Sequence, residues 1–170
     1  KVWQCFHNRE EVMGARYPSA QWRDNSVYEI NSSERPTRWC WGYNNVEADA
    51  IAPYENGEII DYPHDNGNIN LRSFVDAHPS GFNLDGALIH LNVGSFRSYT
   101  KSVKSTNLET DGVIKLTYDP TVAKEWKTKH HHFYLENKLE FLNSENEWFY
   151  DKSKQELYIR LFGDEEPTLD

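Results

Sequence analysis

The chain has 170 residues, of which 38% are hydrophobic, 14% aromatic and 26% charged, and its net charge is −9. This length and composition indicate one β-rich domain over residues 1–170 with a buried core, and they exclude a multidomain machine or a disordered protein. The negative charge argues against a nucleic acid partner, and the absence of a long apolar run predicts no membrane span.

The chain begins at Lys1 rather than Met, and its first residues lack the apolar stretch of an export signal. We therefore expect an excised piece of a longer precursor. Cys5 and Cys40 are its two cysteines. They form a disulfide if the compartment is oxidising, or they stay two separate buried thiols, and both alternatives are open.

Aromatic and basic residues lie close together in the first quarter of the chain. Flat rings pack on the C–H faces of sugars, while guanidinium groups bind hydroxyls or carboxylates. In a strand, Trp39, Trp41 and Tyr43 lie on one face, which makes either a stacking platform or one side of a core. The candidate carbohydrate-binding residues of this region are Trp22, Arg23, Arg38, Trp39, Trp41 and Tyr43.

The stretch Asp65-Asn-Gly-Asn68, with Asn70, has the oxygen-rich composition of a calcium loop. It lacks the glutamate that completes such a loop and fits a tight turn equally well. We expect no cofactor, with structural calcium at this loop as the alternative. A short helix is expected after Asn70, because Leu71, Phe74 and Val75 share one helical face.

The middle of the chain predicts three strands. Residues 87–93 form an apolar run that follows Asp85-Gly86, as expected of a strand buried on both faces. Residues 96–103 and 112–118 predict two strands joined through the turn 109–112, because Asp-Gly tolerates positive φ. In the second of these strands, Ile114, Leu116 and Tyr118 alternate with Val113, Lys115 and Thr117, which indicates one buried face.

A basic set accompanies these strands. It either contacts an anionic glycan or forms a solvated face. Arg97 and Tyr99 join the candidate carbohydrate-binding residues on this basis. The full set is Arg97, Tyr99, Lys101, Lys104, Lys124, Lys127 and Lys129.

The triplet His130-His131-His132 is the strongest metal-like signal in the sequence. Consecutive residues in a strand point to opposite faces, so at most His130 and His132 share one ion. No spacing in the sequence supplies a third ligand, so we predict a polar strand leading into Phe133 and no metal site.

The last quarter predicts a helix and a hairpin. Leu135, Leu139 and Leu142 lie on one face of a helix over 134–142. Residues 147–150 and 156–161 predict strands around the polar turn 151–155. Together the elements predict an all-β domain, a compact antiparallel barrel or sandwich with one or two short helices.

The run from Phe133 to Tyr158 resembles a segment of right-handed parallel β-helix enzymes that degrade polysaccharides. Glu136-Asn137 and the run 147–151 stand at the spacing of that segment, although Glu145-Asn146 replaces its usual Pro-Gly turn. The stretches 10–18 and 86–93 are similar to two further parts of the same region. The resemblance implies an accessory or insertion domain of a secreted, periplasmic or cell-surface glycoside hydrolase or polysaccharide lyase, without the catalytic coils.

The sequence therefore predicts a non-catalytic carbohydrate-binding or accessory module. Its expected partners are a polysaccharide, an anionic one among the candidates, and the catalytic β-helix domain of the same precursor. One alternative is a hydrolase or lyase that uses Glu136, Glu147 or His132. A second alternative is a structural insert whose aromatic residues are internal and whose surface packs on its own β-helix.

Overall fold

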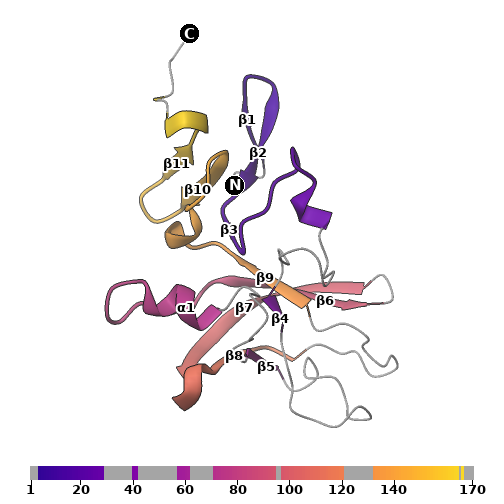
Figure 1. The fold of residues 1–170 in the computed structure, drawn as a ribbon, viewed down its shortest axis with the longest axis vertical. Helices are drawn as coiled ribbons and strands as arrows, with labels where there is room; N and C mark the ends of the chain where they lie inside the picture. Colours follow the sequence, from indigo (N-terminus) through magenta and orange to yellow (C-terminus); the bar gives the residue numbers. More distant parts are fainter. Residues whose placement is uncertain are drawn as a thin grey trace.

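The computed structural model describes residues 4–28, 40–41, 57–61, 71–94, 97–120, 132–164 and 166. Within these residues the strands form two sheets, which lie one above the other in Figure 1. The smaller sheet has the order β1 (Cys5–His7), β2 (Glu10–Gly14), β10 (Glu147–Asp151), β11 (Glu156–Arg160). The larger sheet has the order β3 (Arg16–Tyr17), β9 (His132–Glu136), β6 (Leu88–Gly94), β7 (Arg97–Leu108), β8 (Ile114–Tyr118), β5 (Glu58–Asp61), and β4 (Cys40–Trp41) pairs with β9.

Helical structure in the described part of the chain is short. The α-helix is α1 (Leu71–Asp76), at the position predicted after Asn70. The all-β class with few short helices is thus confirmed. Short 3₁₀ turns occur at η1 (Ser26–Tyr28), η3 (Thr110–Gly112), η4 (Leu139–Phe141) and η5 (Phe162–Asp164).

The smaller sheet joins segments from the two ends of the sequence. Strand β2 pairs in parallel with β10, with Met13 opposite Glu147 and Gly14 opposite Trp148. The other strand pairs of the described residues are antiparallel. The chain passes into the larger sheet between β2 and β3 and returns between β9 and β10, so these two crossings connect the sheets in the described part of the chain.

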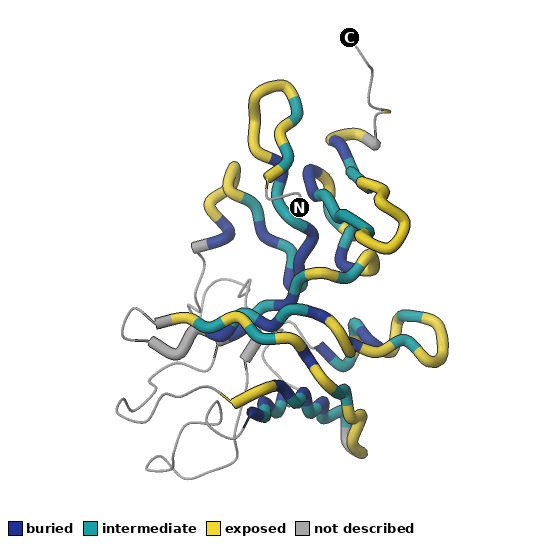
Figure 2. The backbone as a smooth tube through the Cα atoms, turned by 180° about the vertical axis from the view of Figure 1, so that it is seen from behind, coloured by how far each residue is buried: buried dark blue, intermediate teal, exposed yellow. Residues whose placement is uncertain are grey.

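The hydrophobic core lies between the larger sheet and α1. Ile89 and Leu91 of β6 stand opposite Leu135 and Phe133 of β9, and all four side chains are fully buried. Each such residue contributes roughly 1.5–3 kcal/mol through the apolar surface that it removes from water. Along β8, buried and half-buried residues alternate as the sequence predicts, which Figure 2 shows as dark blue and teal.

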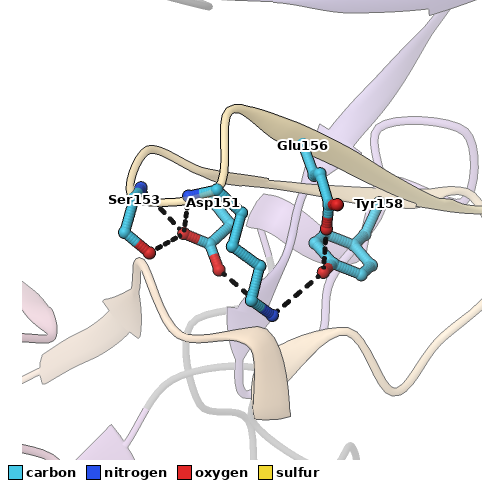
Figure 3. Close-up of polar contacts among 5 residues, drawn as sticks. Asp151, Ser153, Glu156 and Tyr158 are labelled. Carbon is cyan, nitrogen blue, oxygen red and sulfur yellow. Dashed lines mark hydrogen bonds and ion pairs between the residues drawn. The ribbon is translucent and has the colours of Figure 1, made fainter.

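The predicted hairpins are confirmed. Strands β7 and β8 pair around η3, and β10 pairs with β11. In the second turn, Asp151 Oδ1 accepts hydrogen bonds from the backbone N–H of Ser153 at 2.9 Å and of Lys154 at 3.1 Å (Figure 3). The Tyr158 hydroxyl donates to Glu156 at 2.6 Å and accepts from Lys154 at 3.2 Å. These local contacts explain why the polar run 151–155 closes tightly.

The helix predicted over residues 134–142 is wrong. Residues 132–136 form the strand β9, in which buried Phe133 and Leu135 alternate with half-buried Tyr134 and Glu136. Asn137 then adopts a φ of 69°, which ends regular structure, and only η4 follows. The leucines that suggested a helix belong to two different elements, since Leu135 lies in β9 and Leu139 in η4. Burial along β9 alternates with the period of two expected of a strand.

Candidate functional site

A groove of about 690 Å³ lies where the smaller sheet meets the edge of the larger one. Residues 11–14 of β2 and residues 148–150 of β10 line it from the smaller sheet. Leu88 of β6 and Glu136 of β9 line it from the larger sheet. Figure 1 shows β2 and β10 standing above β6 and β9 in this region. The groove therefore depends on the pairing of β2 with β10, which brings the two ends of the chain together.

The wall on the β10 side is aromatic. Trp148, Phe149 and Tyr150 all line the groove and are half-buried. Phe149 also packs against the hydrophobic core, which fixes this part of β10. Trp148 stands opposite Gly14, where a Cβ atom would have no neighbour within 4 Å. The space beside the indole is therefore open because β2 carries a glycine at this register.

The remaining lining is polar. Gln4 donates from Nε2 to Glu11 Oε1 at 3.2 Å, so these two side chains are held together. Hydroxyl groups of a ligand can donate to carboxylates and both donate to and accept from amides. The polar lining residues are Gln4, Glu11, Glu136, Asn137, Lys152 and Gln155.

Glu136 is held in place from behind by groups on the neighbouring strands. His90 of β6 lies with Nε2 2.9 Å from Glu136 Oε2, and Thr100 Oγ1 lies 3.0 Å from His90 Nδ1. The His90 ring stacks on Tyr134 at a centroid distance of 4.5 Å and an interplanar angle of 4°. The histidine behind the carboxylate is thus packed on Tyr134 and hydrogen-bonded to Thr100.

Tyr134 lies between His90 and a buried cation. The guanidinium carbon of Arg16 is 3.7 Å from the centre of the Tyr134 ring. Burial, and then the charge of Glu136, raise the pKa of Tyr134 to about 12, so its hydroxyl keeps its proton at neutral pH. Arg16 is only 2% exposed and donates from Nε to the Pro18 carbonyl at 3.0 Å, which ties β3 to the following turn.

Glu147, a candidate of the enzymatic alternative, is fully buried at the start of β10. Its Oε2 accepts a hydrogen bond from the Ser144 N–H at 3.1 Å, while Oε1 has no partner. Burial raises the pKa of this carboxyl to about 8, against the opposing effect of the Ser144 N–H. Glu147 is not among the residues that line the groove. This geometry fits a residue that holds the 143–146 turn onto β10.

Two predicted residues, Trp22 and Arg23, lie on an exposed patch outside the groove. Trp22 is 47% exposed. The Arg23 guanidinium lies 5.0 Å from the Phe162 ring of η5 and 3.9 Å from Glu10. We call Trp22, Arg23 and Phe162 the Trp22 patch. Nothing in the sequence indicated Phe162, because only the fold brings η5 to this loop.

The other predicted residues are placed as follows. Arg38, Trp39 and Tyr43 lie outside the described residues, and the backbone of Trp41 stands opposite His132. The backbone of Arg97 begins β7. Tyr99 is half-buried and packs against the hydrophobic core, because it stands opposite Leu91 on the core side of the sheet. It is therefore not the freely exposed stacking ring that the sequence suggested.

The basic set contains two lysines with partners. Lys104 forms an ion pair of 2.5 Å with Asp119, and Lys101 donates to the Pro120 carbonyl at 3.4 Å. The predicted calcium loop, Lys124, Lys127, Lys129, His130 and His131 lie outside the described residues. Cys5 carries a free thiol, so it is not bonded to Cys40.

Sequence reasoning did not select the aromatic and amide residues of the groove. Trp148 and Tyr150 were predicted as strand residues, and with Asn137 and Gln155 they lie in the run that resembles polysaccharide-degrading enzymes. Glu11 lies in the similar stretch 10–18, and none of these residues was predicted to bind a ligand. The run 148–150 could have been noticed as three consecutive aromatic residues in a strand, since all three cannot face the same core.

No group of three or more His, Cys, Asp or Glu side chains is arranged to hold a metal ion in the part of the chain that the structure describes. None of the helices among these residues is long and apolar enough to cross a membrane.

Comparison with known proteins gives a similarity of fold. No family model matches the sequence, and no curated protein matches it. A solved structure described as a glycoside hydrolase superposes with a TM-score of 0.57 at 15% sequence identity. The alignment covers 98% of this chain and 25% of that chain, so the fold described above corresponds to about a quarter of that protein.

Proposed function

We propose that this chain is a non-catalytic carbohydrate-binding unit of a longer polysaccharide-degrading enzyme, and that it holds a glycan in the groove between its two sheets. The observation that carries the proposal is the composition of the groove. It combines an aromatic wall with carboxylate and amide groups, and this combination matches the C–H faces and the hydroxyls of a sugar.

The geometry supports stacking at Trp148. The Trp148 side chain is half-buried in β10, and Gly14, its partner residue in β2, leaves open space beside the indole. A sugar ring that enters this space replaces water on an apolar surface and needs no rearrangement of the backbone. Stacking of a flat ring on such a side chain contributes about 1–3 kcal/mol by analogy with bases on aromatic residues.

The polar groups support recognition of hydroxyls. Glu136 lies 2.9 Å from the packed His90, so this carboxylate is positioned before a ligand arrives. The exposed Glu11 accepts a hydrogen bond from Gln4. Preorganised groups lose less side-chain entropy on binding than mobile ones. Asn137, directly after β9, and Gln155, at the end of the β10–β11 turn, add amide donors and acceptors to the lining.

The arrangement favours binding over catalysis. Glu147, whose pKa of about 8 would suit a general acid, is fully buried and outside the groove. The neighbour described as a glycoside hydrolase has about four times the length that this fold covers, which supports a unit of a longer enzyme. Attachment of such a unit to an active site raises the local concentration of the polymer there.

Affinity electrophoresis in gels that contain neutral polysaccharides tests the proposal. Gly14→Phe fills the groove without removing a polar group, and Trp148→Ala removes the stacking surface. We expect each change to weaken retention by roughly tenfold or more. Leu108→Phe is the matched control, because it adds the same ring at an exposed position at the far end of β7.

The alternatives give different results. If the unaltered chain is not retained by any polysaccharide, the proposed function is wrong. If Gly14→Phe folds normally and is retained like the unaltered chain, the groove is not the site. Release of new reducing ends or unsaturated products that is lost in Glu136→Gln would identify an enzyme instead, and a chain that binds no glycan and is poorly soluble alone would identify a structural insert.

A further inference from the structure

We infer that the groove accepts uncharged sugars and discriminates against polyanionic ones such as uronates and sulfated glycans. This inference rests on the proposed function, because it concerns the ligand of the same groove. It starts from the charges on the wall. Among the described residues that line the groove, Glu11 and Glu136 are acidic and Lys152 is basic. The chain as a whole carries a net charge of −9, which adds to the negative potential that a polyanion meets.

Glu136 cannot move away from a bound anion without breaking its own contacts. His90 lies 2.9 Å from its Oε2 and is itself fixed by Thr100 and by stacking on Tyr134. A carboxylate on a flexible surface side chain turns aside when a like charge approaches. The Glu136 carboxylate lies against a packed histidine and has less freedom to turn aside, so part of the repulsion from a uronate persists in the complex.

The nearby cations do not reverse this charge. Arg16 is 2% exposed, faces the Tyr134 ring and donates to the Pro18 carbonyl, so its guanidinium points into the protein rather than into the groove. Lys152 is a single cation in the exposed turn after β10, so it offsets at most one of the two carboxylate charges of the lining. Lys101 and Lys104 interact with Pro120 and Asp119 beside β8, away from the groove lining.

The same carboxylates favour neutral sugars. A sugar hydroxyl that donates to an ionised carboxylate makes a charge-assisted hydrogen bond, which is stronger than a bond between neutral groups. A carboxylate or sulfate on the sugar supplies no proton for Glu11 or Glu136 at neutral pH and must lose water beside them. Selection therefore combines an attraction to hydroxyls with a repulsion of anions, as specific sites commonly do.

The experiment compares pairs of polymers that differ mainly in charge. Suitable probes are hydroxyethyl cellulose against carboxymethyl cellulose, and highly methyl-esterified homogalacturonan against the same polymer after saponification. We measure retention of the unaltered chain by affinity electrophoresis at low and at high salt. In a pair that binds, we expect the uncharged member to be retained about tenfold or more better, with a smaller ratio at high salt because the repulsion is screened.

Variants assign the effect to the groove. Glu11→Gln and the double variant with Glu136→Gln should lower the ratio between uncharged and charged members by raising retention of the charged one. Glu140→Gln, an exposed acid outside the groove, is the control for total charge and should leave the ratio unchanged. Glu11→Gln alone keeps the test valid if Glu136→Gln disturbs folding, because Glu11 is an exposed side chain.

The outcomes separate the two proposals. Equal or better retention of the charged member overturns the inference and leaves the carbohydrate-binding function standing. A preference for the uncharged member that the groove variants do not change also overturns it, because the selection then arises elsewhere on the protein. If no polymer of either kind is retained, the proposed function fails and the inference fails with it.

Discussion

Replacement of the buried Glu147 by glutamine tests the electrostatics of the smaller sheet. The side chain of Glu147 is fully buried, and one of its oxygens has no hydrogen-bond partner. Burial raises its pKa from 4.5 to about 8. At pH 6 the folded protein therefore keeps a proton on Glu147 that the unfolded chain has already lost. Glu147→Gln has nearly the same shape and no titration, so it isolates this effect.

The sign and size of the effect follow from proton linkage. Because the folded state binds more protons than the unfolded state between pH 4.5 and 8, the free energy of unfolding falls as the pH rises through this range. The slope approaches about 1.4 kcal/mol per pH unit for one proton. From pH 5 to pH 8 the unaltered chain should lose roughly 3–4 kcal/mol through Glu147 relative to Glu147→Gln.

Urea unfolding at pH 5, 6, 7 and 8 measures this difference. The unaltered chain, Glu147→Gln and Glu140→Gln are compared at each pH, because Glu140 is an exposed glutamate that gives the same change in composition. We expect the profile of Glu140→Gln to follow that of the unaltered chain and the profile of Glu147→Gln to be flatter. Parallel profiles for all three proteins would refute the assignment of a raised pKa to Glu147.

Three further substitutions test the fold and the Trp22 patch. Gly57→Ala should destabilise the chain by more than about 1 kcal/mol in urea unfolding, since Gly57 has a φ of 70° and a Cβ there would overlap the Tyr118 carbonyl oxygen; an unchanged midpoint would contradict this. Phe141→Ala should lower the free energy of unfolding by about 3–5 kcal/mol, because this fully buried ring packs on Phe74 with 5.6 Å between the ring centroids. A loss below about 1 kcal/mol would show that the site is not tightly packed. Trp22→Ala should reduce retention in polysaccharide gels without lowering the melting temperature if the exposed patch is a second contact for the glycan, and unchanged retention would remove Trp22 from the site.

Local sequence patterns determined much of the larger sheet and the last hairpin of the smaller one. Strand β6 follows from a local apolar run. The β7–β8 and β10–β11 hairpins each pair two strands that are close in sequence, and their turns carry residues that tolerate the backbone conformation required there. Gly86 and Gly112 have φ values of 82° and 80°, and Asp151 caps the last turn with its own carboxylate. Asn146 has a φ of 59°, which explains how it stands in for a turn glycine.

The binding residues were less accessible to sequence reasoning. Trp22 and Arg23 were selected because a ring beside a guanidinium has a recognisable chemistry, and the structure places both on the surface. Tyr99 has the same chemistry but lies on the core side of β7, since its partner residue in β6 is the buried Leu91. Composition alone does not distinguish these cases, because the face of a strand depends on its register.

Only the tertiary structure decided where the groove lies. Its two walls come from residues 11–14 and 148–150, which meet because β2 pairs in parallel with β10. No pattern in either segment specifies a partner more than 130 positions away. The sequence by itself determined the strands, the turns and the acidic balance, since these depend on neighbouring residues and on totals. The groove, the placement of Glu136 beside His90 and the burial of Glu147 depend on long-range pairing, which local periodicity does not encode.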